Sequence, residues 1–153
     1  MRIRTLWVGK TQEEWVRRGI DEYTGRIKRY IPFEINEARE EKGAAAETMR
    51  ERECERLEKL LSKNSRLILL DERGEEMTSP QLAGFIARQR DGAVPELAFV
   101  IGGAYGFSDR FRARADKTIA LSRMTFTHQM VRVFLLEQIY RAFTIINGEP
   151  YHH

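Results

Sequence analysis

The feature that most constrains this chain is an apolar run that ends in a glycine-rich turn. Residues 97–101, with the sequence Leu-Ala-Phe-Val-Ile, are all apolar, and the turn after them contains Gly102, Gly103 and Gly106. A short apolar run bounded by turn residues is typical of a strand covered on both faces by helices. In open sheets of this kind, small molecules bind at the carboxyl ends of the strands, where glycines let a ligand approach the backbone. The sequence therefore predicts an α/β fold with a ligand site at this turn.

Patterns typical of strands and helices alternate along the whole chain. The expected strands span residues 2–8, 33–36, 66–70, 97–101 and 117–121. Five helices are expected. The first opens at a capping-box pattern formed by Thr11 and Glu14, and the second lies in the charged segment 39–63. The third begins at Ser79 with Pro80 in the first helical position, and the last two span 108–114 and 129–143. This alternation predicts a mainly parallel sheet flanked by helices, and the length favours one domain over residues 1–153.

Composition narrows the class of protein only in part. The chain has 26 basic and 23 acidic residues, a formal net charge of +3, which is compatible with an RNA partner but indicates one only weakly. Cys54 is the only cysteine, so it cannot form an internal disulfide, and we interpret it as a bystander on a helix. No apolar run approaches the roughly 20 residues that span a bilayer. The apolar stretch at the start of the chain is too short for a signal peptide. We expect a cytoplasmic protein with no membrane partner and no metal site.

The last expected helix, residues 129–143, is apolar on nearly all sides. Such a helix must be buried on most sides, and so small a domain would offer it little cover. We therefore predict a homodimer built partly on this helix. Arg132 and Arg141 interrupt its apolar surface. Because a buried arginine is costly unless paired, each is expected to meet a carboxylate such as Glu137 or a phosphate-bearing partner.

Three segments follow strands and should meet at the carboxyl edge of the sheet: residues 70–74, 101–106 and 121–126. Their apolar side chains and exposed backbone groups suit a flat heteroaromatic ring such as adenine. The glycines do not form a Gly-x-Gly-x-x-Gly pattern and no Walker lysine follows, which disfavours dinucleotide and triphosphate sites. An ordinary tight loop is the alternative interpretation of the glycines.

Histidine occurs at only three positions. His128 stands at the start of the last helix beside Thr127, a candidate N-cap, so a capping or packing role competes with a chemical one. His152 and His153 end the chain, where a frayed terminus is the alternative to a functional tail.

Several motifs together resemble a known family. They are Leu-Leu-Asp at 69–71, Phe-Val-Ile-Gly-Gly-Ala-Tyr-Gly-Phe at 99–107, Leu-Ser-x-Met-Thr-Phe-Thr-His-Gln-Met-Val-Arg at 121–132, Leu-Glu-Gln-Ile-Tyr-Arg-Ala at 136–142, and the terminal Pro-Tyr-His-His. The chain resembles bacterial large-subunit ribosomal RNA methyltransferases of the SPOUT superfamily. The resemblance spans the whole chain and is densest from residue 97 to the end, whereas the first 65 residues match in element order more than in motif.

The resemblance implies a trefoil knot in the carboxyl-terminal part, an obligate homodimer and S-adenosylmethionine as methyl donor. It also implies methylation of ring N3 of a pseudouridine in helix 69 of 23S rRNA on the assembled 70S ribosome. Matching motifs carry cofactor contacts onto Leu70, Gly102 and residues 121–126, within the loops that the strand pattern brings together. With those loops, the expected cofactor residues are Leu70, Asp71, Ile101, Gly102, Gly103, Gly106, Leu121, Ser122, Arg123, Met124, Thr125 and Phe126.

Methylation of a ring nitrogen requires that the nitrogen lose its proton, so a base or a stabilising cation is needed. The candidate catalytic residues are Tyr151, His152, His153, His128, Arg132 and Arg141. The histidines are candidates for the base, the arginines for electrostatic support, and the tyrosine for stacking on the target base. Two other functions stay open: a SPOUT methyltransferase acting on transfer RNA, and a ribosome-associated nucleotide-binding factor without catalysis.

Overall fold

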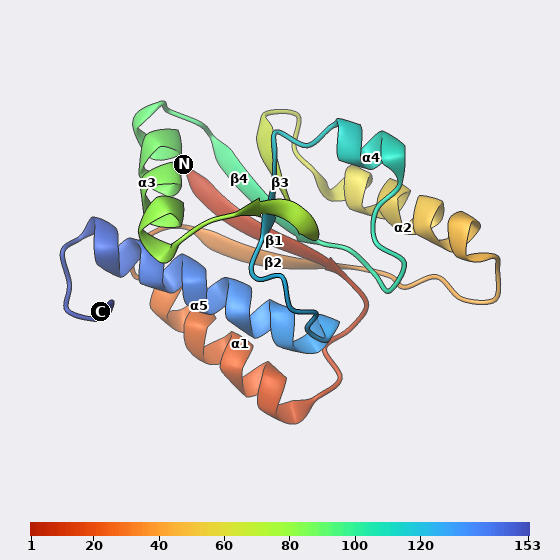
Figure 1. Cartoon of the computed structure of the whole chain (residues 1–153), viewed down its shortest axis with the longest axis horizontal. Coiled ribbons are helices and arrows are strands. Elements are labelled where there is room, and N and C mark those ends of the chain that lie inside the picture. Colours follow the sequence, from red (N-terminus) through yellow and green to blue (C-terminus); the bar gives the residue numbers. More distant parts are fainter.

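The computed structural model describes all 153 residues and alternates strands with helices throughout (Figure 1). The strands are β1 (Arg2–Val8), β2 (Phe33–Ala38), β3 (Ser65–Glu76), β4 (Glu96–Ile101) and β5 (Lys117–Ala120). The helices are α1 (Glu14–Ile27), α2 (Ala46–Leu60), α3 (Ser79–Asp91), α4 (Asp109–Ala113) and α5 (His128–Ile146). Every expected strand and helix is present, although several begin or end at different residues.

The strands form one sheet in the order β2-β1-β4-β3-β5, and all four neighbouring pairs are parallel. This confirms the predicted parallel sheet. β4 lies in the centre, and all six of its residues are buried. Because every strand runs the same way, the carboxyl ends of β3, β4 and β5 share one edge of the sheet.

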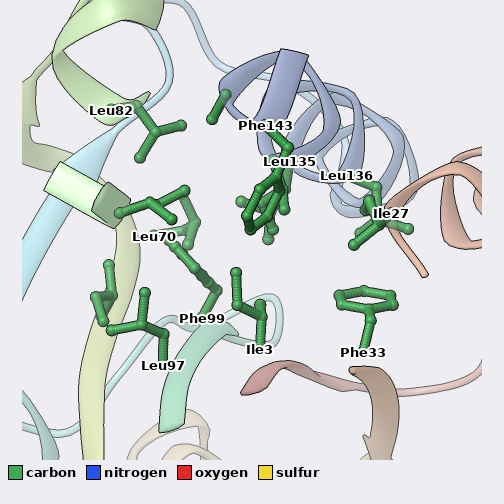
Figure 2. Close-up of a cluster of buried hydrophobic side chains, with 14 of the residues drawn as sticks. Ile3, Ile27, Phe33, Leu70, Leu82, Leu97, Phe99, Leu135, Leu136 and Phe143 are labelled. Atoms are coloured by element: carbon green, nitrogen blue, oxygen red, sulfur yellow. The ribbon is translucent and has the colours of Figure 1, made fainter. Parts of the chain in front are cut away.

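Helices cover both faces of the sheet (Figure 1). α1, α3 and α5 pack over one face around a cluster of 21 buried apolar residues, and α2 and α4 pack over the other around a cluster of 11. Successive β4 residues alternate between them: Leu97, Phe99 and Ile101 belong to the larger cluster, Ala98 and Val100 to the smaller. Figure 2 shows part of the larger cluster, where side chains of α5 approach Phe99 of β4.

α5 is covered by the chain itself more fully than its sequence predicted. It packs against both α1 and α3 and lies over the sheet, so Leu135, Leu136 and Ile139 are fully buried (Figure 1). Phe134 is the large apolar side chain of this helix that stays exposed, at 36%. The expectation of little cover is therefore wrong, and the homodimer stays a prediction. No helix combines the length and the hydropathy that crossing a membrane requires.

The predicted cap of the first helix is wrong. α1 begins at Glu14 after Glu13, and no side chain caps it. Thr11 is buried three residues earlier, where its hydroxyl accepts a hydrogen bond from the Arg132 guanidinium (3.0 Å). The Thr11 hydroxyl therefore makes a tertiary hydrogen bond rather than the helix cap that the local pattern predicted.

The cap of α3 lies one residue earlier than predicted. Thr78 is the N-cap, and its hydroxyl and the Gln81 side chain form a reciprocal capping box. Pro80 therefore occupies the second helical position rather than the first. Ser79 is free for another contact, and its hydroxyl donates to Gln138 Oε1 of α5 (2.6 Å).

Candidate functional site

A cavity of about 590 Å³ lies where β3, β4 and β5 end, between the three predicted loops. Eleven of the twelve residues expected to contact a cofactor line it: Leu70, Asp71, Ile101, Gly102, Gly103, Gly106, Leu121, Ser122, Met124, Thr125 and Phe126. The exception is Arg123, whose side chain is 88% exposed and pairs with Glu76 outside the cavity (2.5 Å). The residues that line it without having been assigned to a cofactor are Glu72, Arg73, Ala104, Tyr105, Phe107, Arg112, His128 and Val131.

The structure explains why two positions of the glycine turn, 102 and 106, are occupied by glycine. Gly106 has a φ of +74°, a conformation that other residues adopt only with strain, and its N–H donates to the carbonyl of Gly103 (3.0 Å). A Cβ on Gly102 would lie 3.2 Å from two ring carbons of Phe107. The turn is thus a tight loop, and it also forms one wall of the cavity.

The segment after Leu70 is part of β3 rather than the predicted loop, because the strand continues to Glu76. Its pairing with β5 is irregular, since Leu70 and Glu75 both lie opposite Ile119. Residues 71–73 bulge away from β5, which brings Asp71 and Glu72 to the cavity, whereas Gly74 lies against Ile119. The Thr125 hydroxyl donates to Glu72 Oε2 (3.1 Å) and so joins this bulge to the third loop.

Asp71 is held by two donors at the cavity wall. Its Oδ1 accepts the N–H of Arg73 (2.8 Å), and its Oδ2 pairs with Arg112 Nη1 (2.6 Å). Burial opposes the charge, but these two donors outweigh it and lower the pKa of the Asp71 carboxyl. Arg112, on α4, also stacks over Phe107, with its guanidinium 5.6 Å from the ring centroid. Sequence reasoning missed Arg112; the signal for it was a basic residue on the helix that follows the glycine turn.

His128 is the one candidate catalytic residue at this cavity. It opens α5, and Thr127 caps the helix as predicted by accepting the Met130 N–H (3.2 Å). Although the residue as a whole is exposed, atoms pack around its imidazole ring. This partial burial and then Arg132 lower the pKa of His128, against the opposing effects of Glu40 and the Gly102 backbone. The imidazole is therefore held neutral near pH 7 and can accept a proton.

Arg132 does not reach the cavity and is only 2% exposed. Its Nη2 donates to the carbonyl of Val8 (2.8 Å), its Nη1 to the Thr11 hydroxyl, and its guanidinium lies 4.9 Å from the centroid of the Trp7 ring. No carboxylate forms an ion pair with it, and its Nε has no hydrogen-bond partner in the chain. The expected carboxylate partner is wrong for this residue, since backbone, hydroxyl and ring take its place.

Arg141 does meet the predicted carboxylate. Its Nε and Nη2 donate to Glu137 Oε1 at 3.0 and 2.6 Å. The tail folds back onto this pair: the Tyr151 hydroxyl donates to the same Glu137 oxygen (3.1 Å), and His152 Nδ1 lies 3.3 Å from Arg141 Nη1. The tail is therefore packed rather than frayed, except for the exposed His153.

Tyr151, His152 and His153 do not line the 590 Å³ cavity of their own chain. Tyr151 and His152 contact α5 at Glu137 and Arg141, and at 1.5 Å per residue the helix carries Arg141 about 20 Å from His128. Their anchor Glu137 lines a second cavity of about 280 Å³, which shares Leu121, Ser122 and Phe126 with the first. No group of three or more His, Cys, Asp or Glu side chains in the chain could hold a metal ion.

Comparison with known proteins gives matches over the full length. A family model described as "Predicted SPOUT methyltransferase" matches residues 1–152. The chain is 80% identical over 153 residues to a protein of Geotalea uraniireducens named "Ribosomal RNA large subunit methyltransferase H", covering 100% of both. It is 76% identical to a protein of Geobacter metallireducens with the same name, covering 100% of this chain and 99% of that one.

A solved structure is also similar. It is the SpoU methyltransferase AviRb from Streptomyces viridochromogenes in complex with AdoMet, with a TM-score of 0.47 and 14% sequence identity. The match covers 92% of this chain and 57% of that chain.

Proposed function

The chain belongs to the SPOUT methyltransferase family, and on that basis we propose that it transfers a methyl group from S-adenosylmethionine to large-subunit ribosomal RNA. The observation that carries the proposal is the 80% identity, over the whole length of both chains, to a protein named as a methyltransferase of large-subunit ribosomal RNA. The proposed acceptor is ring N3 of a pseudouridine in helix 69 of 23S rRNA, on the assembled ribosome and in the cytoplasm. The motifs at 99–107 and 121–132 and the Pro-Tyr-His-His tail support this finer assignment.

The cavity suits an adenosyl group. Leu70, Ile101 and Phe126 give it apolar walls, while the glycine turn offers backbone donors and acceptors without a Cβ in the way. Its volume of about 590 Å³ lies within the range of small-molecule sites. A Cβ on Gly102 would meet the Phe107 ring at 3.2 Å, so side chains larger than glycine would disturb this wall.

The chain's own residues would position the reactants and handle the proton. When bound, the donor supplies an electrophilic methyl group on a sulfonium centre. The apolar walls would reduce the water around the methyl group, and holding two reactants in line would supply much of the acceleration. His128, neutral because burial and Arg132 lower its pKa, stands at the cavity where a ring N–H must lose its proton.

We also propose a homodimer, with residues 1–153 as one SPOUT domain whose carboxyl-terminal part is knotted. The tail of each chain packs on Glu137 and Arg141, away from its own cavity. In a dimer, the tail of one copy can close over the cavity of the other. Tyr151 would then stack on the target base, with His152 and His153 beside it as further candidates for the base.

The test combines binding with three substrates. Isothermal titration calorimetry with S-adenosylmethionine is followed by transfer of a radiolabelled methyl group to intact ribosomes, free 23S rRNA and transfer RNA. We expect the protein to bind S-adenosylmethionine and to transfer the radiolabelled methyl group to intact ribosomes alone. Reverse transcription of the product should stop at the helix 69 pseudouridine, because an N3-methyl group blocks the pairing edge of the base. Label on transfer RNA would favour the other SPOUT activity, and binding without transfer would favour the non-catalytic factor.

A pair of glycine variants tests the cavity. Gly102→Val places new methyl groups against Phe107 and should weaken donor binding. Gly25→Val, on α1 with nothing within 4 Å of the added Cβ, is the matched control and should bind normally. If both variants bound S-adenosylmethionine equally well, the cavity would not be the donor site.

A further inference from the structure

A buried carboxyl lies directly behind the glycine turn. Glu53 belongs to α2, does not line the cavity, and is only 3% exposed. Its Oε2 accepts the N–H of Glu41 (3.1 Å), whereas its Oε1 has no hydrogen-bond partner in the chain. An unpartnered buried carboxyl oxygen costs stability, so packing alone does not explain a glutamate here.

The unpartnered oxygen faces Gly103. A Cβ built on Gly103 would lie 2.5 Å from Glu53 Oε1, 3.1 Å from Cδ and 3.3 Å from Oε2, and no other atom comes as close. Gly103 does not have a positive φ, unlike Gly106 at +74°. No positive φ calls for glycine at position 103, so the close approach of Glu53 is the feature that does.

The neighbouring residue of α2 holds the other side of the turn. Cys54 Sγ accepts the N–H of Ser108 (3.3 Å), and both residues are buried. Two consecutive residues of one helix thus contact the segment at Gly103 and at Ser108. Since Gly103 lines the cavity, the position of α2 sets the position of this wall.

We propose that Glu53 is a positioning residue for the methyl donor, acting through the glycine turn. The inference rests on the proposed function, because it assumes that the cavity holds the donor. Glu53 does not line the cavity; its carboxyl fixes how far the backbone of Gly103 stands from α2 and hence how the turn presents its backbone groups. Glycine at 103 and glutamate at 53 then form a coupled pair.

The test is a double-mutant cycle measured as the Kd for S-adenosylmethionine. Gly103→Ala should weaken binding about tenfold, equivalent to ~1.4 kcal/mol, because its Cβ displaces the Glu53 carboxyl and the turn. Glu53→Ala should weaken binding severalfold by removing the support. Adding Gly103→Ala to Glu53→Ala should cost almost nothing more, because the clash is gone.

Two further measurements separate positioning from general folding. Glu53→Gln keeps the size of the side chain and an acceptor for the Glu41 N–H, so it should recover most of the affinity lost in Glu53→Ala. In methyl transfer to ribosomes, Gly103→Ala should raise the KM for the donor and leave kcat nearly unchanged. The matched controls are Glu55→Ala, at an exposed position of the same helix, and Gly25→Ala, where nothing lies near the added Cβ. Both should have the donor Kd and KM of the unmodified protein.

The outcomes are distinguishable. If Gly103→Ala costs as much in the Glu53→Ala background as alone, or if Glu53→Ala binds as tightly as the unmodified protein, the positioning role is wrong while the proposed function stands. If the unmodified protein binds no donor, the proposed function fails and this inference falls with it.

Discussion

Gly74 offers the sharpest test of how the chain builds the cavity. An alanine Cβ at this position would lie 2.7 Å from the backbone N and C of Ile119 and 2.8 Å from its Cα. Non-bonded carbons normally lie about 3.5–4.0 Å apart, so β3 and β5 would have to separate by about 1 Å. No side-chain rotation relieves this contact, because every atom involved belongs to the backbone.

The expected cost follows from this displacement. Overpacking a close-packed site costs about 1–3 kcal/mol, and the upper part of that range applies here because a strand rather than a side chain must move. Gly74→Ala should therefore lower the free energy of unfolding by ~2–3 kcal/mol. At a urea m-value of about 2 kcal/mol/M, the unfolding midpoint falls by about 1 M or slightly more.

The assay compares urea unfolding of Gly74→Ala with that of Gly25→Ala at one protein concentration. Gly25 lies inside α1 with nothing within 4 Å of an added Cβ, so its alanine variant should gain about 0.5–1 kcal/mol from helix propensity. Gly74→Ala should also lose donor affinity, because residues 71–73 bulge from the same site. Midpoints that shift alike in the two variants, or a Gly74→Ala midpoint at the unmodified value, would refute the reasoning.

Three further predictions address the site. Deleting residues 151–153 should abolish methyl transfer to ribosomes and leave the Kd for S-adenosylmethionine within about twofold by calorimetry. The reason is that no tail residue lines the cavity of its own chain and the proposed role of the partner's tail is to hold the target base. Full turnover would contradict a role for the tail. His128 should titrate below 6.5 by NMR, because burial and then Arg132 lower its pKa, so the stability it contributes is complete above pH 6.5 and lost as the pH falls through the lowered value. Arg132→Met should move that midpoint upward, and an unmoved midpoint would exclude the electrostatic coupling. Asp71→Asn should destabilise the protein by about 1–3 kcal/mol at pH 7. The difference should shrink as the pH falls below 3.8 and through the lowered pKa of Asp71, as a series of thermal melts from pH 7 downward would show. A difference that stays constant throughout the series would mean that the carboxylate pairing with Arg112 is not its source.

The sequence predicted those features of the fold that depend on local pattern. β4 was identifiable because a strand buried on both faces needs apolar residues at every position, and Leu97 to Ile101 supply them. The three segments were expected at one edge of the sheet because parallel strands place their carboxyl ends there. They share one cavity because β4, β3 and β5 are neighbours in the sheet, which no pattern in the sequence indicated.

Features that depend on distant contacts could not be predicted this way. Thr11 has the local pattern of a helix cap, but its hydroxyl binds Arg132, 121 residues away in sequence. The extension of β3 beyond Leu70 depends on Gly74 passing against Ile119, which no pattern in either segment indicates. In each case a tertiary partner outweighs a local preference worth about 1 kcal/mol.

The position of the tail also depends on distant contacts that the sequence did not predict, and it supports the proposed homodimer. A chain terminus is frayed unless something holds it, and here Glu137 accepts from both Tyr151 and Arg141 while Tyr140 packs edge-on against Tyr151, with 4.7 Å between ring centroids. Held there, the tail does not line the cavity beside His128 in its own chain. The exposed Phe134, whose ring meets that of Phe126 at 5.1 Å, lies between these two regions of the helix. A second chain packed on this surface would cover Phe134 and bring its own tail toward the cavity, so one interface would account for both observations.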